Sequence, residues 1–291
     1  MGIKTIFGMY LLSVLAGCQP NTGNSASRAD SAEMTQDTLG QELLADKTFI
    51  LDRQLDEISG HTFLAVKPEL LYAVQDELGA VFTYNLNDGT TESAYKFAGS
   101  GDYEDITTDG TNFYVLRSDG TIFSFPTSLD APKDQVVTTK GLLGKGEYES
   151  MAYDPTSKNI YVLCKECKQD KGNPAVSGYI LNIGTNGTLT LQQEFKLDLN
   201  KVGEMAGKTM KSMRPSAITK RGNNQWFVLS AVDNLLIILN EQWVPQRVIR
   251  FGKKQFEQPE GIAFDAQDRL FISSEKNKGE NAVVYQFNTI R

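Results

Sequence analysis

Three glutamates occur at equivalent places along the chain, each at the start of a short apolar segment. They are Glu104, Glu149 and Glu260, and Ser59 and Ser216 take the same place in two further copies of the segment. Carboxylate oxygens are the ligands that Ca²⁺ and Mg²⁺ prefer, whereas zinc sites usually contain histidine or cysteine. If the fold brings the copies together, the glutamates are suited to a divalent-cation site or to the chemistry of a metal-dependent hydrolase.

A second set of side chains ends the second segment of each copy. This set consists of Asp76, Ser118, Lys165, Ala231 and Glu275. The candidate cation ligands are therefore Glu104, Glu149, Glu260, Asp76 and Glu275, and the candidate ligand-binding residues are Ser59, Arg117, Arg214 and Ser216. Carboxylates gathered without compensation repel one another and have raised pKa values. In the alternative, structural interpretation, Arg117 and Arg214 neutralise the glutamates, or each glutamate bonds neighbouring backbone amides.

The copies themselves predict β-structure. In the second copy, the turn Asp109-Gly110 precedes the apolar segment 113–116, and Asp119-Gly120 leads into the segment 121–125. Asp-Gly between alternating apolar segments is a strong hairpin signal. Successive copies begin 45, 45, 67 and 44 residues apart, and a period of this length is typical of repeat architectures.

Single β-rich stretches between the copies supply a fourth strand for each. They are 93–97, 135–138, 191–197 and 247–251, and the stretch 48–51 serves the last copy from the other end of the chain. The sequence thus predicts an all-β propeller of five four-stranded blades, whose ring is closed by an N-terminal strand. A sixth blade in the 67-residue interval is the alternative, although residues 200–212 show no strand pattern.

In a propeller the innermost strands all begin at one face, so both sets of side chains should meet around one end of the central channel. We call this end the channel mouth, and Asp76, Glu104, Glu149, Glu260 and Glu275 the mouth acids. The longer connections 164–177, 198–213 and 275–281 fall on the same face and are rich in lysine. A basic rim of this kind would attract an anionic small molecule, a glycan acid or a partner protein. Alternatively, these lysines are solvated loop residues.

The N-terminus has the anatomy of an export signal. Lys4 precedes an apolar run, and residues 15–18 resemble the bacterial lipobox, whose cysteine receives a diacylglycerol with acyl chains such as palmitate. We expect residues 1–17 to be a lipoprotein signal peptide, 18–42 a flexible tether lipidated at Cys18, and 43–291 a single propeller domain in aqueous space. Gln19 after the cysteine favours the outer membrane over the inner. The alternative is an ordinary signal peptide with an incidental cysteine.

Cys164 and Cys167 are the cysteines that remain once Cys18 is lipidated. In an oxidising envelope compartment they are candidates for a disulfide. A closed zinc site is not supported, because it needs further cysteine or histidine ligands and the chain has one histidine, His61. With 29 basic and 36 acidic residues the net charge is −7, which excludes a basic nucleic-acid binder.

Several phrases resemble those of the SdiA-regulated, YjiK-like family of envelope propellers. They are 56–60, 102–104, 213–218 and 258–264, the last containing Pro259-Glu260-Gly261, together with 270–275. The Pro-Glu-Gly phrase is also similar to NHL repeats and to gluconolactonase-type propellers. The resemblance implies an envelope β-propeller that binds a divalent cation such as Ca²⁺ or Mg²⁺, with no established catalytic activity.

The sequence therefore favours a monomeric, non-enzymatic envelope lipoprotein that binds a partner or small ligand on its loop-rich face. The alternative function is a metal-dependent hydrolase or lactonase that uses the mouth glutamates. The absence of a second histidine or an evident base near them counts against that alternative.

Overall fold

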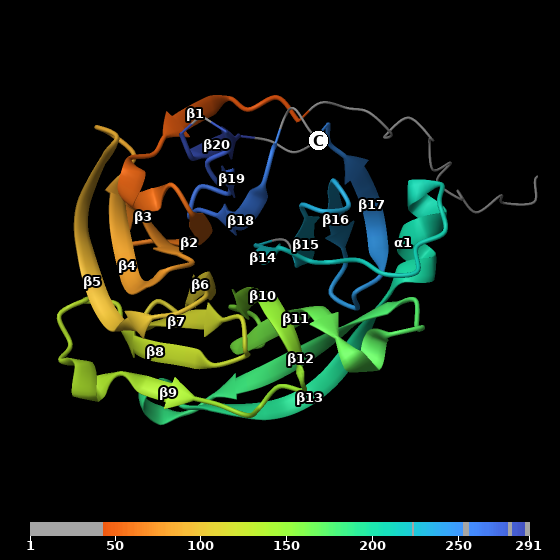
Figure 1. Ribbon diagram of the computed structural model, residues 1–291, viewed down its shortest axis with the longest axis horizontal. Coiled ribbons are helices and arrows are strands. Elements are labelled where there is room, and N and C mark those ends of the chain that lie inside the picture. Colours follow the sequence, from red (N-terminus) through yellow and green to blue (C-terminus); the bar gives the residue numbers. More distant parts are fainter. Residues whose placement is uncertain (1–42, 223, 253–255, 279–280, 289–291) are drawn as a thin grey trace, which may run out of the picture. The chain divides into compact units, whose positions relative to one another are not determined.

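The computed structural model describes residues 43–222, 224–252, 256–278 and 281–288. These residues form five antiparallel sheets of four strands each, arranged as a five-bladed β-propeller (Figure 1). The innermost strands are β2 (Ile58–Leu64), β6 (Tyr103–Thr108), β10 (Gly146–Asp154), β14 (Ala217–Arg221) and β18 (Pro259–Phe264). The second strands are β3 (Lys67–Gln75), β7 (Asn112–Arg117), β11 (Asn159–Cys167), β15 (Gln225–Ser230) and β19 (Leu270–Ser274).

The outer strands complete each sheet at the positions expected from the repeat. The third strands are β4 (Leu78–Asn85), β8 (Ile122–Pro126), β12 (Ala175–Ile183), β16 (Leu235–Leu239) and β20 (Val283–Phe287). The fourth are β5 (Thr90–Ser100), β9 (Val137–Thr139), β13 (Leu189–Asp198), β17 (Pro245–Arg250) and β1 (Lys47–Ile50). The prediction of five four-stranded blades is confirmed, and the six-bladed alternative is wrong.

The N-terminal strand closes the ring. Strand β1 pairs antiparallel with β20, so that Lys47 lies opposite Gln286 and Ile50 opposite Val283. The last blade therefore combines the beginning and the end of the propeller chain, which removes two free sheet edges. Closure fixes the angular position of every innermost strand around the channel.

The hairpin turns form because their sequences supply the backbone geometry. Gly110 and Gly120 have φ values of 88° and 79°, which side chains rarely tolerate. The Asp119 carboxylate accepts from the Thr121 amide, and the Asp109 carboxylate accepts from the Asn112 amide. These aspartates therefore stabilise the turns that the sequence predicts.

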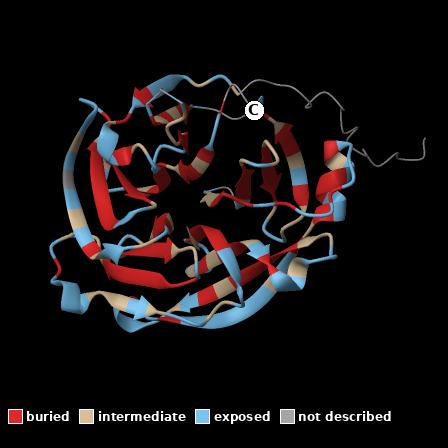
Figure 2. Cartoon of the chain, viewed as in Figure 1, coloured by how far each residue is buried: buried red, intermediate tan, exposed pale blue. Residues whose placement is uncertain are grey.

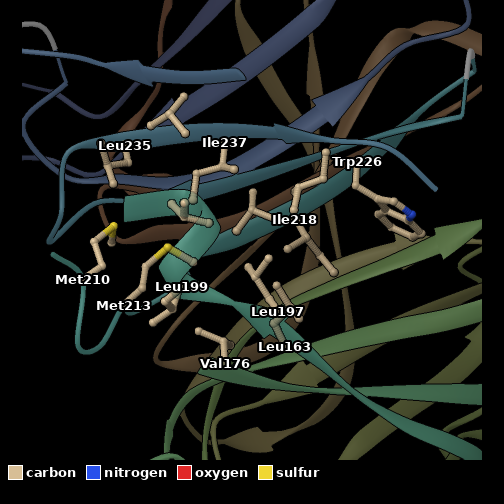
Figure 3. Close-up of a cluster of buried hydrophobic side chains, with 14 of the residues drawn as sticks. Leu163, Val176, Leu197, Leu199, Met210, Met213, Ile218, Trp226, Leu235 and Ile237 are labelled. Carbon is tan, nitrogen blue, oxygen red and sulfur yellow. The ribbon is translucent and has the colours of Figure 1, made fainter. Parts of the chain in front are cut away.

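The long interval between the third and fourth blades contains a helix instead of a blade. Helix α1 (Leu199–Ala206) begins with the Asp198 carboxylate accepting from the Asn200 amide, and it ends at Gly207 with φ of 63°. Val202 and Leu199 are fully buried, and Met210 and Met213 follow the helix into the same cluster as Trp226 (Figure 3). The interval thus packs against the propeller through these apolar side chains, including both methionines.

The core consists of the interfaces between neighbouring blades. Phe63 of the β2 blade packs on Phe271 of the β19 blade, and Tyr72 packs on Phe113 of the next blade. Buried residues gather where the sheets face one another, whereas outer strands such as β13 are largely exposed (Figure 2). Because each blade is buried only by its neighbours, the ring is one cooperative unit.

No helix in the described part of the chain is long and apolar enough to cross a membrane. The expected signal peptide (1–17) and the lipidated tether (18–42) lie outside the described residues.

Candidate functional site

The structure places the mouth acids at strand ends on one face of the ring. Glu104, Glu149 and Glu260 lie near the starts of the innermost strands β6, β10 and β18. Asp76 and Glu275 directly follow the second strands β3 and β19. Together, four of the five blades contribute a carboxyl group to the channel mouth.

Backbone hydrogen bonds hold the ends of these second strands in position. The Asp76 amide donates to the Glu57 carbonyl, and the Glu275 amide donates to the Gln258 carbonyl. The Tyr103 amide donates to the Asp76 carbonyl, which joins the first blade to the second. The mouth is therefore built on rigid strand ends.

The mouth acids are partly buried and act on one another. Burial raises the pKa of Glu104 to about 9, and the negative charges of Asp102, Glu260 and Glu147 add to the shift. Burial likewise raises the pKa of Glu275 to about 8, with contributions from Glu260, Glu57 and Asp76. Because Glu104 and Glu260 belong to different blades, this coupling shows that acids far apart in sequence share one site.

Two further mouth acids follow the same pattern. Burial raises the pKa of Glu260 to about 7. Burial also raises the pKa of Asp76, and the charges of Glu57, Glu77 and Asp102 act in the same direction. The Oδ1 atom of Asp76 is buried without a hydrogen-bond partner in the described structure. The negative potential at the mouth is thus only partly compensated.

Lys165 compensates part of this negative potential. Its ammonium group forms an ion pair with Glu149 and lies 3.4 Å from the Glu147 carboxylate. Its positive charge also lowers the pKa values of Glu104, Glu260 and Glu275 against the larger effect of burial. One ammonium therefore serves carboxylates from three different blades.

A pair of β-bulges aims Lys165 and Glu149 at each other. In the pairing of β10 with β11, Glu147 lies opposite Glu166, Tyr148 opposite Cys164, and Ser150 opposite Leu163. This register leaves Lys165 as the extra residue on one strand and Glu149 as the extra residue on the other. Bulges redirect side chains and are common beside functional sites.

The two arginines do not neutralise the mouth glutamates. The Arg117 guanidinium binds the Asp119 carboxylate within its own hairpin, with Nη2 2.7 Å from Oδ2. Arg214 Nη2 lies 3.1 Å from Glu166 Oε2 on the exposed side of β11. The alternative interpretation, in which these arginines neutralise the mouth glutamates, is therefore wrong, and among the described residues Lys165 is the basic group paired with a mouth glutamate.

The two serines at first-strand starts are buried and hydrogen-bonded to backbone. The Ser216 hydroxyl donates to the Pro259 carbonyl and accepts from the Ala231 amide. The Ser59 hydroxyl donates to the Glu57 carbonyl. These contacts position the mouth and leave the carboxylates as its chemically prominent groups.

The mouth acids are not gathered as closely as the ligands of a bound metal. Within the described residues, the one group of at least three metal-ligating side chains with ligand atoms inside 4.8 Å of one another is Cys164, Cys167 and Asp170. In that group the two cysteines are joined as a disulfide, so their sulfurs are not thiolate ligands. The oxygen donors at the mouth suit Ca²⁺ or Mg²⁺, but the carboxylates would have to move inward around the ion.

Below the mouth, the channel contains a cavity of about 150 Å³ lined by all five innermost strands. His61 and Asp105 line it, and both are almost fully buried. His61 Nδ1 lies 3.1 Å from Ser273 Oγ, and burial lowers its pKa to about 3. The Asp105 carboxylate accepts from the amides of Ile106 and Met151, which ties the second blade to the third.

A groove of about 220 Å³ lies beside the mouth, between the Cys164–Cys167 turn and the segment after α1. Its lining includes Lys165, Lys171, Lys211 and Arg214, together with Cys167. Lys171 and Lys211 are exposed, as the loop-rich rim predicts. Lys165 therefore contacts both the acidic mouth and the basic groove.

Among solved structures, one similar structure supports the fold, and two others align less closely. Glutaminyl cyclase from Myxococcus xanthus aligns with a TM-score of 0.59 at 10% identity, covering 84% of this chain and 94% of that one. A luciferin-regenerating enzyme aligns with a TM-score of 0.48 at 12% identity, covering 82% and 95%. Virginiamycin B lyase from Staphylococcus aureus aligns with a TM-score of 0.43 at 12% identity, covering 84% of this chain and 74% of that one.

A search of the curated proteins finds no match. The family model described as SdiA-regulated matches residues 50–279, which include all five mouth acids and span the propeller from its first to its last blade. The chain belongs to the SdiA-regulated family.

Proposed function

We propose that this protein is a non-enzymatic, ligand-binding propeller of the bacterial envelope whose channel mouth takes up a divalent cation, Ca²⁺ or Mg²⁺. One observation carries the proposal: carboxyl groups from four blades converge around the Lys165 ammonium group, and burial raises the pKa values of those from the first, second and fifth blades. A bound cation would relieve the repulsion among these carboxyl groups, so part of the strain in the free protein becomes binding free energy.

The face around the mouth supports a role in binding a further ligand or partner. The groove beside the mouth has a basic lining that includes the exposed Lys171 and Lys211. An anionic group in this groove and a cation at the mouth would attract each other across Lys165. The proposed ligand is therefore a small anion or an anionic partner surface, with the cation as its companion.

Calorimetric titration of the full-length protein with CaCl₂ and MgCl₂ tests the cation. We expect binding that weakens about tenfold or more in Glu260→Gln, because an oxygen ligand at the centre of the mouth loses its charge. Glu241→Gln is the matched control, since Glu241 is an exposed acid in the β16–β17 turn, away from the mouth. Absence of heat with either ion, or equal affinities in both variants, would contradict the proposal.

A hydrolase or lactonase is the second candidate function, and the pKa of Glu260 near 7 favours it. A carboxyl group with a pKa near the working pH is suited to general acid–base catalysis. A panel of lactones and esters, assayed with and without Ca²⁺, distinguishes the candidates. Turnover that disappears in Glu260→Gln would make the protein an enzyme, and no turnover on the panel favours the binding role.

Attachment to the membrane through a lipidated Cys18 completes the proposal. Its support is the sequence, in which the cysteine directly follows an apolar export segment. Two or more acyl chains hold a protein on a membrane stably, whereas one chain does not. Full-length protein should therefore sediment with the envelope fraction, and Cys18→Ser should not carry lipid in its intact mass. If the wild type and Cys18→Ser sediment equally and the wild type carries no lipid, the proposed lipid anchor is contradicted.

A further inference from the structure

Lys165 reaches the mouth because the backbone beneath it is irregular. It is the extra residue of the bulge on β11, and its ammonium meets Glu149, the extra residue of the facing bulge on β10. In a regular antiparallel pair, the residues of both strands would alternate in matched register. The two bulges therefore determine the direction in which the Lys165 side chain points.

The disulfide encloses the distorted segment. Cys164 and Cys167 are bonded to each other and bracket Lys165 and Glu166 in the sequence Cys-Lys-Glu-Cys. The Cα atoms of the two cysteines are 6.0 Å apart, so the two residues between them are held in a short, closed loop. Glu166 turns outward to Arg214, while Lys165 turns inward to the mouth acids.

The facing strand packs directly against the disulfide. A side chain at Gly146 would meet the sulfurs of both Cys167 and Cys164, so only glycine fits there. The Cys167 sulfur lies 3.7 Å from the Tyr148 hydroxyl, and the Cys164 sulfur lies 3.4 Å from the Glu147 carbonyl. The sulfur bridge thus braces the same two strands whose bulges aim Lys165 and Glu149.

The charge that this segment carries is the one that a bound cation would replace. Lys165 acts on Glu104, Glu260 and Glu275 in addition to its ion pair with Glu149. The carboxylates stand around its ammonium and are too far apart to close on a metal ion. A divalent cation at the mouth must therefore displace Lys165 from the carboxylates.

We propose that Lys165 is a built-in counter-ion that determines the cation affinity of the channel mouth, and that the Cys164–Cys167 disulfide positions it. This inference rests on the proposed function. When a dithiol donates two electrons, the S–S bond breaks, each cysteine sulfur takes up a proton, and the dithiol becomes a disulfide. The bulge is then free to relax, Lys165 leaves the carboxylates, and the mouth binds a cation more tightly. Cys167 lines the groove beside the mouth but is only 3% exposed, so the reductant reaches the bridge when the loop between the cysteines opens locally.

The test is calorimetric titration with CaCl₂ of full-length protein in the oxidised form and after reduction with dithiothreitol. Reduction should increase the affinity for Ca²⁺ about tenfold, a coupling of the size usual between two linked sites. The double variant Cys164→Ser, Cys167→Ser should match the reduced protein. Lys165→Met should bind Ca²⁺ tightly in both redox states, because the competing charge is absent whether or not the bridge is formed.

Lys158→Met is the matched control, since Lys158 is an exposed lysine in the turn between β10 and β11, at the opposite end of these strands from the disulfide. It should behave as the wild type, with the same gain on reduction. If reduction lowers the melting temperature but leaves the Ca²⁺ affinity unchanged, while Lys165→Met binds, the disulfide is purely structural and the inference is wrong. If no form binds Ca²⁺, including Lys165→Met, the proposed function itself fails.

Discussion

The two ends of the central channel each pair a lysine with a carboxylate, but they do so with opposite results. At the far ends of the innermost strands, Lys220 of β14 lies 2.7 Å from Asp154 of β10, and both side chains are about 5% exposed. Burial alone would raise the pKa of Asp154, yet hydrogen bonds from Lys220, Ser157 and the Thr156 amide outweigh it and lower the pKa. At the mouth, Lys165 faces several acids, and their pKa values are raised.

The difference separates a structural ion pair from a candidate site. The far-end pair has one cation for one anion, with further donors to the carboxylate, and Lys220 also lies over the ring of Trp226. The mouth gathers several acids with raised pKa values around Lys165, and one Asp76 oxygen is buried without a hydrogen-bond partner in the described structure. Burying charge without full compensation costs stability, and proteins retain such arrangements chiefly where they serve a function.

The largest effect should come from the far end. Lys220→Met leaves Asp154 buried without its cation, and removal of one partner of a buried pair costs about 3 to 5 kcal/mol. Urea unfolding should show this loss of unfolding free energy. Lys133→Met, at an exposed lysine on the outer part of the second blade, is the control. A loss below about 1 kcal/mol would mean that the two ends of the channel do not differ as described.

The channel between the two ends should respond to acid. His61 is buried with a pKa of about 3, against an ordinary value of 6.5. Between these values the unfolded chain binds a proton that the folded chain does not, so stability falls as the pH is lowered from 6.5 towards 3. The contribution is at most about 1.4 kcal/mol per pH unit. His61→Gln should flatten this slope in unfolding experiments at pH 7, 6 and 5, and an unchanged slope would contradict it.

An effect of opposite sign is expected at the mouth. Because the pKa of Glu104 is about 9 in the folded protein and near 4.5 when unfolded, the folded state retains a proton that the unfolded state releases between these values. Stability therefore falls as the pH rises through this range. Glu104→Gln should remove this loss, which grows by at most about 1.4 kcal/mol per pH unit, and so should stabilise the protein at pH 8 but not at pH 4. Destabilisation at pH 8 would show that the Glu104 charge is well compensated.

The fold could be predicted from the sequence because the blade motif repeats along the chain. Turn pairs such as Asp109-Gly110, alternating apolar segments and the period of the copies each report local geometry, and ring closure by residues 48–51 follows from counting strands. Helix α1 was missed, although Asp198 and Gly207 are typical N-terminal and C-terminal capping residues. The helix is short and contains Gly203, so the apolar spacing of Leu199, Val202 and Ala206 did not indicate a helix in the sequence.

Only part of the candidate site could be predicted from the sequence. The strand ends that carry the mouth acids are set by the repeat, and the position of Lys165 at a second-strand end follows from the same reasoning. The sequence does not report the two bulges, since these depend on how β10 and β11 pair. It therefore offered Arg117 and Arg214 as neutralising groups in the alternative interpretation, and it did not indicate Glu57, Asp102 and Glu147 as additional acids acting on the mouth.

The most direct test of the account is a carboxyl NMR titration of glutamates Glu104, Glu260 and Glu275 in the oxidised protein, with and without CaCl₂. The account predicts midpoints near 9, 7 and 8 in the free protein, all displaced to lower pH when Ca²⁺ is present. Midpoints close to 4.5 that do not respond to Ca²⁺ would contradict it, because the acids would then be neither gathered nor poised to take up a cation.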